Sequence, residues 1–236
     1  SLGAKLGQPF VVENKPGAAG NLGVGQAAKA EPDGQTFVVV PAGNIAVNPT
    51  LFSDLPYKQA DLAPVTMLAT VENVLVVHPS VDAKTLPELL ALAQRKSGEL
   101  SFASPGAGSQ AHLAGELMQL DGHVKLIHVP YKGTTPAVQD LVGGQVTMMF
   151  AQLQSALPFI KDGRLRAIGI ASPNRSPVLP ELPTIAEQGL KDFEAVSWYA
   201  LMAPAGTPAA IVDKLAAEAT AILLEPANKE KFAGLG

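Results

Sequence analysis

A glycine-rich turn carries the residues of this 236-residue chain that are best placed to do chemistry. The turn runs from Ser104 to Ser109 and joins a short apolar run to an amphipathic stretch that begins at Gln110. Its glycines leave backbone N–H groups accessible, and a helix that follows Ser109 would direct the positive end of its dipole to the same place. Such a turn can present a nucleophile, hold a nucleotide phosphate or bind another anion.

The serines of the turn do not have the spacing of a catalytic nucleophile. A nucleophile elbow needs glycines two residues before and two residues after the serine. At that distance Phe102 precedes Ser104, and Ala107 precedes Ser109. No acidic pair or histidine cluster has the spacing of metal ligands. We therefore expect no catalytic residue and no metal site.

A dinucleotide-binding site is a second possible use of the turn. The segment "GAGSQA" matches the relaxed form of the Gly-x-Gly-x-x-Gly fingerprint, and so does "GVGQAA" from Gly23. The fingerprint also needs an acidic residue about 20 positions later to hold the ribose. The corresponding segment "KLIHVPYKG" offers Lys125 and Lys132 but no acid. A nucleotide-dependent α/β enzyme remains the alternative function, although we expect no cofactor.

The third use is an anion cradle without catalysis. Gly106 and Gly108 allow neighbouring N–H groups to turn toward one point, and Ser109 adds a hydroxyl. This arrangement suits a carboxylate. The alternative is that the turn simply joins a strand to a helix, with Ser109 as an ordinary N-cap. The residues of the turn alone leave both interpretations open.

The composition excludes several other classes of protein. Hydrophobic residues make up 47% of the chain and charged residues 16%, which argues against disorder. The formal net charge of −4 and the lack of a basic block argue against a nucleic-acid partner. The chain has no cysteine, so disulfides and thiolate metal sites are excluded. No apolar run reaches the ~20 residues of a membrane span.

Short apolar runs alternate with helical patterns along the chain, which predicts an α/β fold with largely parallel sheets. The expected shorter strands are 9–14, 36–43, 100–104, 124–131, 145–151 and 165–172. The expected helices are 21–34, 85–100, 109–120, 135–144, 155–163 and one that starts at 207. Residues 44–49 are expected to form a loop.

Helix caps follow from residue types and spacing. Thr85 with Glu88, and Thr184 with Glu187, form capping boxes. Thr135 is expected to cap the next helix, and Thr207, with Pro208 after it, to open the last one. His112, in a first helical turn, and His128, inside a strand, are expected to make structural contacts.

Two apolar runs, Val65–Pro79 and Phe193–Gly206, are longer than an ordinary strand of about 5–6 residues. They suit a chain that crosses from one lobe to another and later returns. The expected first lobe comprises residues 1–74 and 196–236, and the second comprises residues 75–195. Ligands of open α/β sheets bind beyond the carboxyl ends of the strands, which in this arrangement predicts a cleft between the lobes.

The order and spacing of several segments closely resemble the substrate-binding receptors of the tripartite tricarboxylate transporter family, also called Bug receptors. The segments are "VVENKPGAAGNLG", "AEPDGQTFVV", "SFASPGAGSQAHLAGEL", "HVPYKGTTPAVQDLVGGQV", "SALPFIKDGRLRAIGIAS", "LPTIAEQG" and "SWYALMAPAGTP". The resemblance implies a two-lobed, type II periplasmic-binding-protein fold of the Venus flytrap kind. It also implies a periplasmic receptor that binds a small carboxylate (a di- or tricarboxylate, an aromatic acid or an amino acid) and delivers it to membrane permease subunits.

The resemblance implies that two strand–turn–helix elements, one per lobe, hold the ligand carboxylate with backbone N–H groups and waters. The second-lobe element corresponds to the turn from Ser104 to Ser109. Tyr131 is added because its strand end could face the cleft. The expected ligand-binding residues are Asn44, Ser104, Gly106, Ala107, Gly108, Ser109, Tyr131, Gln152 and Trp198. We expect the protein to be a monomer.

The sequence departs from the family pattern at both ends. The family begins with a strand and a "PFxxGG"-type turn that forms the first-lobe element, and it continues past "FAGLG" into further helix. Neither part has a counterpart here, so we expect the first-lobe side of the clamp to be incomplete. After "MF" this chain has Ala151, Gln152 and Leu153, where many relatives have an acidic or Asn-containing step. A neutral Gln152 would not repel an anion.

Overall fold

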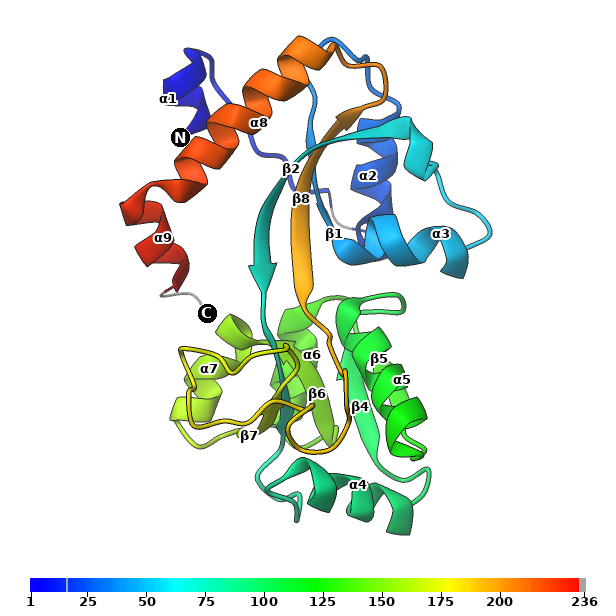
Figure 1. Ribbon diagram of the computed structural model, residues 1–236. Coiled ribbons are helices and arrows are strands. Elements are labelled where there is room, and N and C mark those ends of the chain that lie inside the picture. Colours follow the sequence, from blue (N-terminus) through cyan, green and yellow to red (C-terminus); the bar gives the residue numbers. More distant parts are fainter. Residues whose placement is uncertain (16, 234–236) are drawn as a thin grey trace. The chain divides into compact units, whose positions relative to one another are not determined.

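The computed structural model describes residues 1–15 and 17–233 and divides the chain into two compact units (Figure 1). Unit 1 comprises residues 1–70 and the segment that begins at Trp198, and unit 2 comprises Val71–Ser197. Each unit combines a sheet with helices, as the α/β pattern predicts. Within the described residues, no helix is both long and apolar enough to cross a bilayer.

Unit 2 is built on a five-stranded sheet with the strand order β5-β4-β6-β3-β7. Its strands are β3 (Asn73–Val77), β4 (Ser101–Ser104), β5 (Ile127–Pro130), β6 (Met148–Gln152) and β7 (Arg166–Ile170). Its helices are α4 (Leu86–Arg95), α5 (Gln110–Gly122), α6 (Thr134–Val142) and α7 (Leu153–Lys161). Each of these strands and helices overlaps one that the apolar patterns predict.

Both faces of the unit 2 sheet are covered. All five residues of β3 are buried. Along this strand Leu75 and Val77 pack into one apolar core, whereas Val74 and Val76 pack into the other. This alternation follows from the two-residue period of a strand, which sends successive side chains to opposite faces. The sheet is therefore held from both sides, which gives its strand ends fixed positions.

The sheets contain more antiparallel pairing than the prediction of largely parallel sheets implies. In unit 2, β4 is parallel to both β5 and β6, but β3 is antiparallel to both β6 and β7. Four strands therefore share one direction and β3 runs against them. In unit 1 the described pairing of β1 with β8 is antiparallel. Strand β3 follows β2 (Leu62–Val71) with only Glu72 between them, although β2 belongs to the other sheet.

Unit 1 contains a three-stranded sheet of order β1-β8-β2, with β1 at Val38–Pro41 and β8 at Ser197–Pro204. Its helical elements are α1 (Leu2–Leu6), η1 (Ala18–Gly20), α2 (Asn21–Ala28), η2 (Gly43–Val47), α3 (Asn48–Leu51), η3 (Gln59–Asp61), α8 (Ala209–Leu224) and α9 (Pro226–Ala233). Its apolar core is small, and the buried members of that core are Val24, Val40, Tyr57, Leu62 and Met202.

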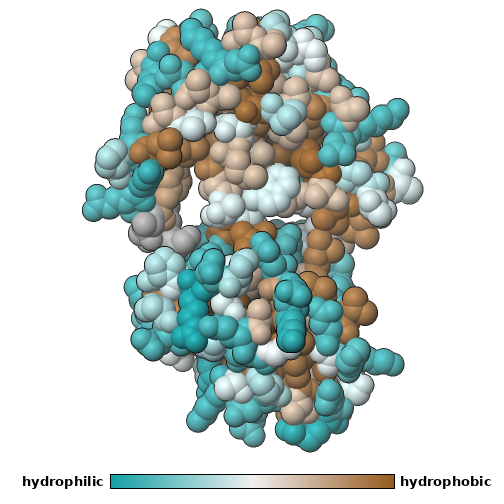
Figure 2. Space-filling view, viewed as in Figure 1, coloured by the Kyte–Doolittle hydropathy of each residue, from teal (hydrophilic) through white to brown (hydrophobic). Residues whose placement is uncertain are grey.

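Exposed apolar side chains are concentrated in unit 1. Most of the large apolar side chains that are exposed belong to this unit, and they are Phe10, Val11, Val12, Leu22, Val39, Leu51, Met67, Leu224 and Phe232. The space-filling view shows apolar surface over unit 1, and over unit 2 a largely hydrophilic face with apolar atoms along its right side (Figure 2). A three-stranded sheet with few buried residues covers less apolar surface than a five-stranded sheet with two filled faces.

Two predicted elements of unit 1 are wrong. Residues 9–14 form no strand, and Val11 and Val12 are 82% and 84% exposed. A strand needs a hydrogen-bonding neighbour, and no described strand pairs with this segment. Residues 44–49, expected as a loop, lie instead in the π-helical turn η2 and the short helix α3. Buried side-chain amides, described below, hold this segment in place.

The helix caps are partly as predicted. Thr85 accepts the Glu88 N–H (3.4 Å), but the Glu88 carboxylate takes the Lys84 N–H (2.6 Å) rather than that of Thr85. The Thr184–Glu187 box forms in both directions, at 3.0 and 2.7 Å, yet only turns follow it.

The two other predicted helix starts are shifted by one or two residues. Helix α6 begins at Thr134 after Gly133, so Thr135 already lies inside it. Thr207 precedes the N-cap Pro208, and its hydroxyl donates to the Pro204 carbonyl (2.8 Å).

Gly115 in α5 provides a test of the packing that supports β4. A Cβ at this position would overlap the ring of Phe102, which is fully buried. Gly115→Ala gains about 1 kcal/mol of helix propensity, but overpacking a core costs about 1–3 kcal/mol. We expect a net decrease in the free energy of unfolding, measured by urea denaturation. Gly122→Ala in the same helix is the control, because its Cβ meets the flexible end of Leu90. Equal effects of the two substitutions would contradict this account.

Candidate functional site

The glycine-rich turn emerges at the carboxyl end of β4, beside the end of β5. The side chain of Ser104, the last residue of β4, is fully buried. The Tyr131 N–H donates to the Ser104 carbonyl (2.8 Å), and the Gly133 N–H donates to the Pro105 carbonyl (3.1 Å). These bonds extend the β4–β5 ladder beyond the strands. They fix the start of the turn against the segment that leads into α6.

Several N–H groups of the turn are bonded within it. The Gly106 N–H donates to Ser104 Oγ (3.2 Å), and the Ser109 N–H donates to the Gly106 carbonyl (3.2 Å). The Gly108 N–H donates to Nδ1 of His112 (3.1 Å). Gly106 and Gly108 have φ values of 145° and 79°, a region that favours glycine. The turn is therefore internally bonded, and these three N–H groups are not the ones it presents outward.

Other N–H groups at the start of α5 have no protein partner. Ser109 caps the helix as predicted, with its Oγ accepting the His112 N–H (3.3 Å). Among the described residues, the N–H groups of Ala107, Gln110 and Ala111 donate to no atom. Ala107 is exposed at the outside of the turn. These are the donors that an anion at the positive end of the helix dipole would use.

The start of α4 is the contrasting case within the same unit. Its N–H groups are taken by protein oxygens: Lys84 N–H by Glu88, Leu86 N–H by Oε1 of Gln188 (2.8 Å) and Glu88 N–H by Thr85. The start of α6 has no side-chain cap, because its N-cap is Gly133, whereas the start of α5 is capped by Ser109. Because β4 and β5 are parallel neighbours, α5 and α6 begin at the same edge of the sheet.

Tyr131 lies beside the turn, but its hydroxyl points to α6. The hydroxyl donates to Oδ2 of Asp140 (2.7 Å). Burial, together with this bond to the Asp140 carboxylate, raises the pKa of Tyr131 to about 12. The hydroxyl therefore stays protonated at neutral pH and serves as a donor to Asp140. Tyr131 contacts the turn through its backbone. Its carbonyl oxygen lies so close to Gly106 that a Cβ added at Gly106 would be 3.6 Å from it.

The remaining expected site residues are distributed over both units. Gln152 ends β6, and its Oε1 accepts from Nε2 of Gln154 (3.2 Å). Trp198 is half-buried in β8 of unit 1. Asn44 is buried in η2, also in unit 1. The structure thus brings the turn residues and Tyr131 together in unit 2.

Asn44 belongs to a buried polar network that the sequence did not reveal. Oδ1 of Asn21 accepts from Nδ2 of Asn44 (2.7 Å) and from Nδ2 of Asn48 (2.6 Å), and the Tyr57 hydroxyl lies 2.9 Å from it. The same hydroxyl lies 2.7 Å from the Asn44 carbonyl oxygen. Buried polar groups are costly unless hydrogen-bonded, so the network holds η2 and α3 against the start of α2. Only Asn44 of this set was expected at the site.

Two histidines contact the turn from behind. Nε2 of His128 lies 2.6 Å from Ser104 Oγ, and the rings of His112 and His128 stack at 4.1 Å between centroids. Burial, together with the neighbouring His112, lowers the pKa of His128 to about 4. His128 is therefore neutral at pH 7. The sequence predicts structural contacts for both residues, but it does not show that these contacts are with the turn.

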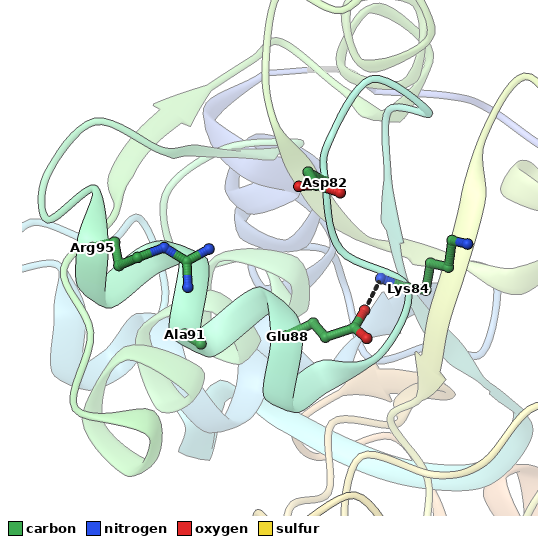
Figure 3. A pocket seen from close by; sticks show the side chains of 5 residues that line it. All are labelled: Asp82, Lys84, Glu88, Ala91 and Arg95. Atoms are coloured by element: carbon green, nitrogen blue, oxygen red, sulfur yellow. Dashed lines mark hydrogen bonds between the residues drawn. The ribbon is translucent and has the colours of Figure 1, made fainter.

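A surface hollow beside α4 is a weaker candidate for an anion site. It is lined by Asp82, Lys84, Glu88, Ala91 and Arg95. The two acidic side chains balance the two basic ones, and the basic ones lie at opposite ends of the view (Figure 3). The Glu88 carboxylate is already bonded to the Lys84 N–H. Nothing in this hollow converges on one anion, and the described residues contain no cluster that could hold a metal ion.

The comparison with known proteins gives a family match over the whole chain. The family model described as "Tripartite tricarboxylate transporter family receptor" matches residues 1–236. The protein BugT of Bordetella pertussis is 40% identical over 238 residues, which cover all of this chain and 73% of BugT.

Solved structures agree with this match. R. palustris Rpa4515, solved with adipate, is 33% identical with a TM-score of 0.94, and the match covers all of this chain and 79% of Rpa4515. MatC from Rhodopseudomonas palustris, solved with bound malate, is 34% identical with a TM-score of 0.91, and the match covers all of this chain and 80% of MatC. With a family model that covers every residue, a two-unit α/β fold and relatives at these identities, this chain belongs to the receptors of the tripartite tricarboxylate transporter family.

Proposed function

We propose that this receptor binds a small carboxylate through the turn Ser104–Ser109 and catalyses no reaction on it. The observation that carries the proposal is the set of N–H groups at Ala107, Gln110 and Ala111, which have no partner among the described residues. They lie at the positive end of a 13-residue helix. A ligand oxygen would complete the hydrogen bonding that the protein leaves open.

Backbone donors suit a carboxylate in particular. Hydrogen bonds to a charged acceptor contribute about 1.5–3 kcal/mol each, and the helix dipole adds about 0.3–1 kcal/mol at its first turn. Recognition by N–H groups needs no cationic side chain, and Lys132, the basic residue next to Tyr131, is exposed. Binding would therefore depend on the conformation of the turn more than on the charge of one residue.

The substrate class follows from the similar proteins and from the neutral surroundings of the turn. Rpa4515 was solved with adipate and MatC with bound malate, and both of these ligands are dicarboxylates. In this proposal the turn takes one carboxylate. Gln152 at the end of β6, a neutral amide, would tolerate an anion near the same sheet edge. Dicarboxylates are thus the first ligands to test.

The wider role follows from family membership. The receptor would deliver its ligand to the membrane permease subunits of a tripartite transporter and would act in the periplasm as a monomer. The expected ligand-binding residues, Asn44, Tyr131, Gln152 and Trp198 among them, remain a proposal. A nucleotide-dependent enzyme is the alternative, and the absence of a ribose-binding acid after β5 counts against it.

Calorimetric titration with acetate, malate, adipate and citrate is the first test of the proposed function. We expect saturable binding of at least one dicarboxylate. A dicarboxylate can accept hydrogen bonds at both of its carboxylates, whereas acetate has only one carboxylate to accept them. ATP and NAD serve as the comparison ligands, and neither should bind. Binding of a nucleotide with turnover, and of no carboxylate, would support the alternative instead.

Gly108→Val tests the turn directly. An L-residue in a left-handed conformation costs roughly 1–2 kcal/mol, and the turn can relieve this strain only by moving its N–H groups. We expect the dissociation constant for the bound carboxylate to rise more than about tenfold, which corresponds to ~1.4 kcal/mol. Ser109→Ala should lower the free energy of unfolding by about 1 kcal/mol, because the helix loses its N-cap. Lys132→Ala should leave the affinity nearly unchanged.

The matched control for this substitution is Gly98→Val. Gly98 has a φ of 74°, close to the 79° of Gly108, and a Cβ there would meet nothing within 4 Å. It therefore carries the same backbone strain before the start of β4, whereas the turn follows the end of that strand, and it should not change the affinity. If a folded Gly108→Val protein, checked by circular dichroism, binds the carboxylate as the control does, the turn is only a connector.

A further inference from the structure

The inference concerns the two histidines behind the turn. Nδ1 of His112 accepts the Gly108 N–H at 3.1 Å. A ring nitrogen that accepts a hydrogen bond carries no proton, so the neutral ring of His112 holds its proton on Nε2. That nitrogen lies 3.7 Å from Oε1 of Glu116 on the next turn of α5. The side chain of His112 therefore reaches back over the helix start and bonds the turn that precedes it.

His128 contacts the other end of the same turn. Its Nε2 lies 2.6 Å from Ser104 Oγ. Ser104 Oγ in turn accepts the Gly106 N–H (3.2 Å) and lies 3.1 Å from the Gly106 carbonyl oxygen. The hydroxyl of Ser104 thus connects His128 to Gly106. One histidine fixes Gly106 through this serine, and the other fixes Gly108 directly.

The two rings are themselves held by stacking. His112 and His128 stack at 4.1 Å with an interplanar angle of 25°, and His128 stacks on Phe102 at 4.9 Å. Phe102 is fully buried in β4, and its ring fits beside Gly115 of α5. The stacked rings therefore connect the buried strand β4 to the two histidines that contact the turn. This stacking helps to orient the imidazole nitrogens toward the turn.

The turn needs contacts from outside because its own residues do little to restrict its backbone conformation. Two of its residues are glycines, and ordering the backbone of one residue costs about 1–2 kcal/mol. Ala107, whose N–H has no partner among the described residues, lies between the two bonded glycines. A donor that is already in place when the ligand arrives binds more tightly than one that must be ordered on binding.

We propose that His112 and His128 are positioning residues that hold the turn in its carboxylate-binding conformation by bonding Gly108 and, through Ser104, Gly106. This inference rests on the proposed function, since it assigns the means by which the same turn is preorganised. Neither histidine touches the ligand in this account. They act on affinity through the geometry of the backbone donors.

The experiment compares paired amide substitutions. An asparagine amide lies where Nδ1 of histidine lies, and a glutamine amide reaches the position of Nε2. His112→Asn keeps an acceptor for the Gly108 N–H, whereas His112→Gln moves it away. His128→Gln keeps a partner for Ser104 Oγ, whereas His128→Asn does not. All four variants lose the stacked ring, so the loss of stacking is the same within each pair.

We expect opposite orders at the two positions. The dissociation constant of the dicarboxylate that the unsubstituted protein binds should rise about fivefold to tenfold more in His112→Gln than in His112→Asn, the range of one net hydrogen bond. At position 128 the asparagine variant should be the weaker one. If asparagine and glutamine bind alike at both positions, or follow the same order at both, the proposal is overturned.

Amide hydrogen exchange at Gly108, followed by NMR without ligand, separates this proposal from the proposed function. The Gly108 N–H should exchange slowly in the unsubstituted protein and in His112→Asn, and at least about tenfold faster in His112→Gln. If no carboxylate binds to any variant, the proposed function fails and exchange alone decides the positioning role. Equal exchange rates in the His112 pair would overturn that role. Ser104→Ala, nearly equal in volume, replaces His128→Asn if that variant does not fold.

Discussion

The pairing of β4 with β5 is the interaction on which the candidate site depends. The ladder continues past the strands through the Tyr131 N–H bond to the Ser104 carbonyl and the Gly133 N–H bond to the Pro105 carbonyl. Because β4 is buried on both faces, its end cannot shift without disturbing two apolar cores. The turn, the start of α5 and the start of α6 all take their positions from this one edge of the sheet.

Within unit 2, the starts of α4 and α5 differ in how their backbone N–H groups are bonded. At α4 the protein supplies its own oxygens from Thr85, Glu88 and Gln188, so that helix start is closed. At α5 the protein caps one N–H with Ser109 and leaves those of Ala107, Gln110 and Ala111 without a partner among the described residues. The same backbone donors are therefore bonded within the protein at one helix start and left open at the other.

The two units are stabilised in different ways. Unit 2 has a five-stranded sheet with an apolar core on each face, whereas unit 1 has a three-stranded sheet, a small core and most of the exposed large apolar side chains. In unit 1 the amides of Asn21, Asn44 and Asn48 contribute a buried polar network. Such a network specifies one arrangement of η2 and α3, because a buried amide that loses its partners is costly.

The sequence by itself determined the α/β class, the strands and helices of unit 2 and the glycine-rich turn capped by Ser109, because these follow from local periodicity and from side chains that bond their own backbone. Only the tertiary structure decided that β3 runs against its neighbours and that residues 9–14 form no strand, because strand direction and pairing depend on residues far away in the chain. The same holds for the histidines: His128 reaches Ser104 across 24 positions, and no local pattern encodes a contact made across a sheet.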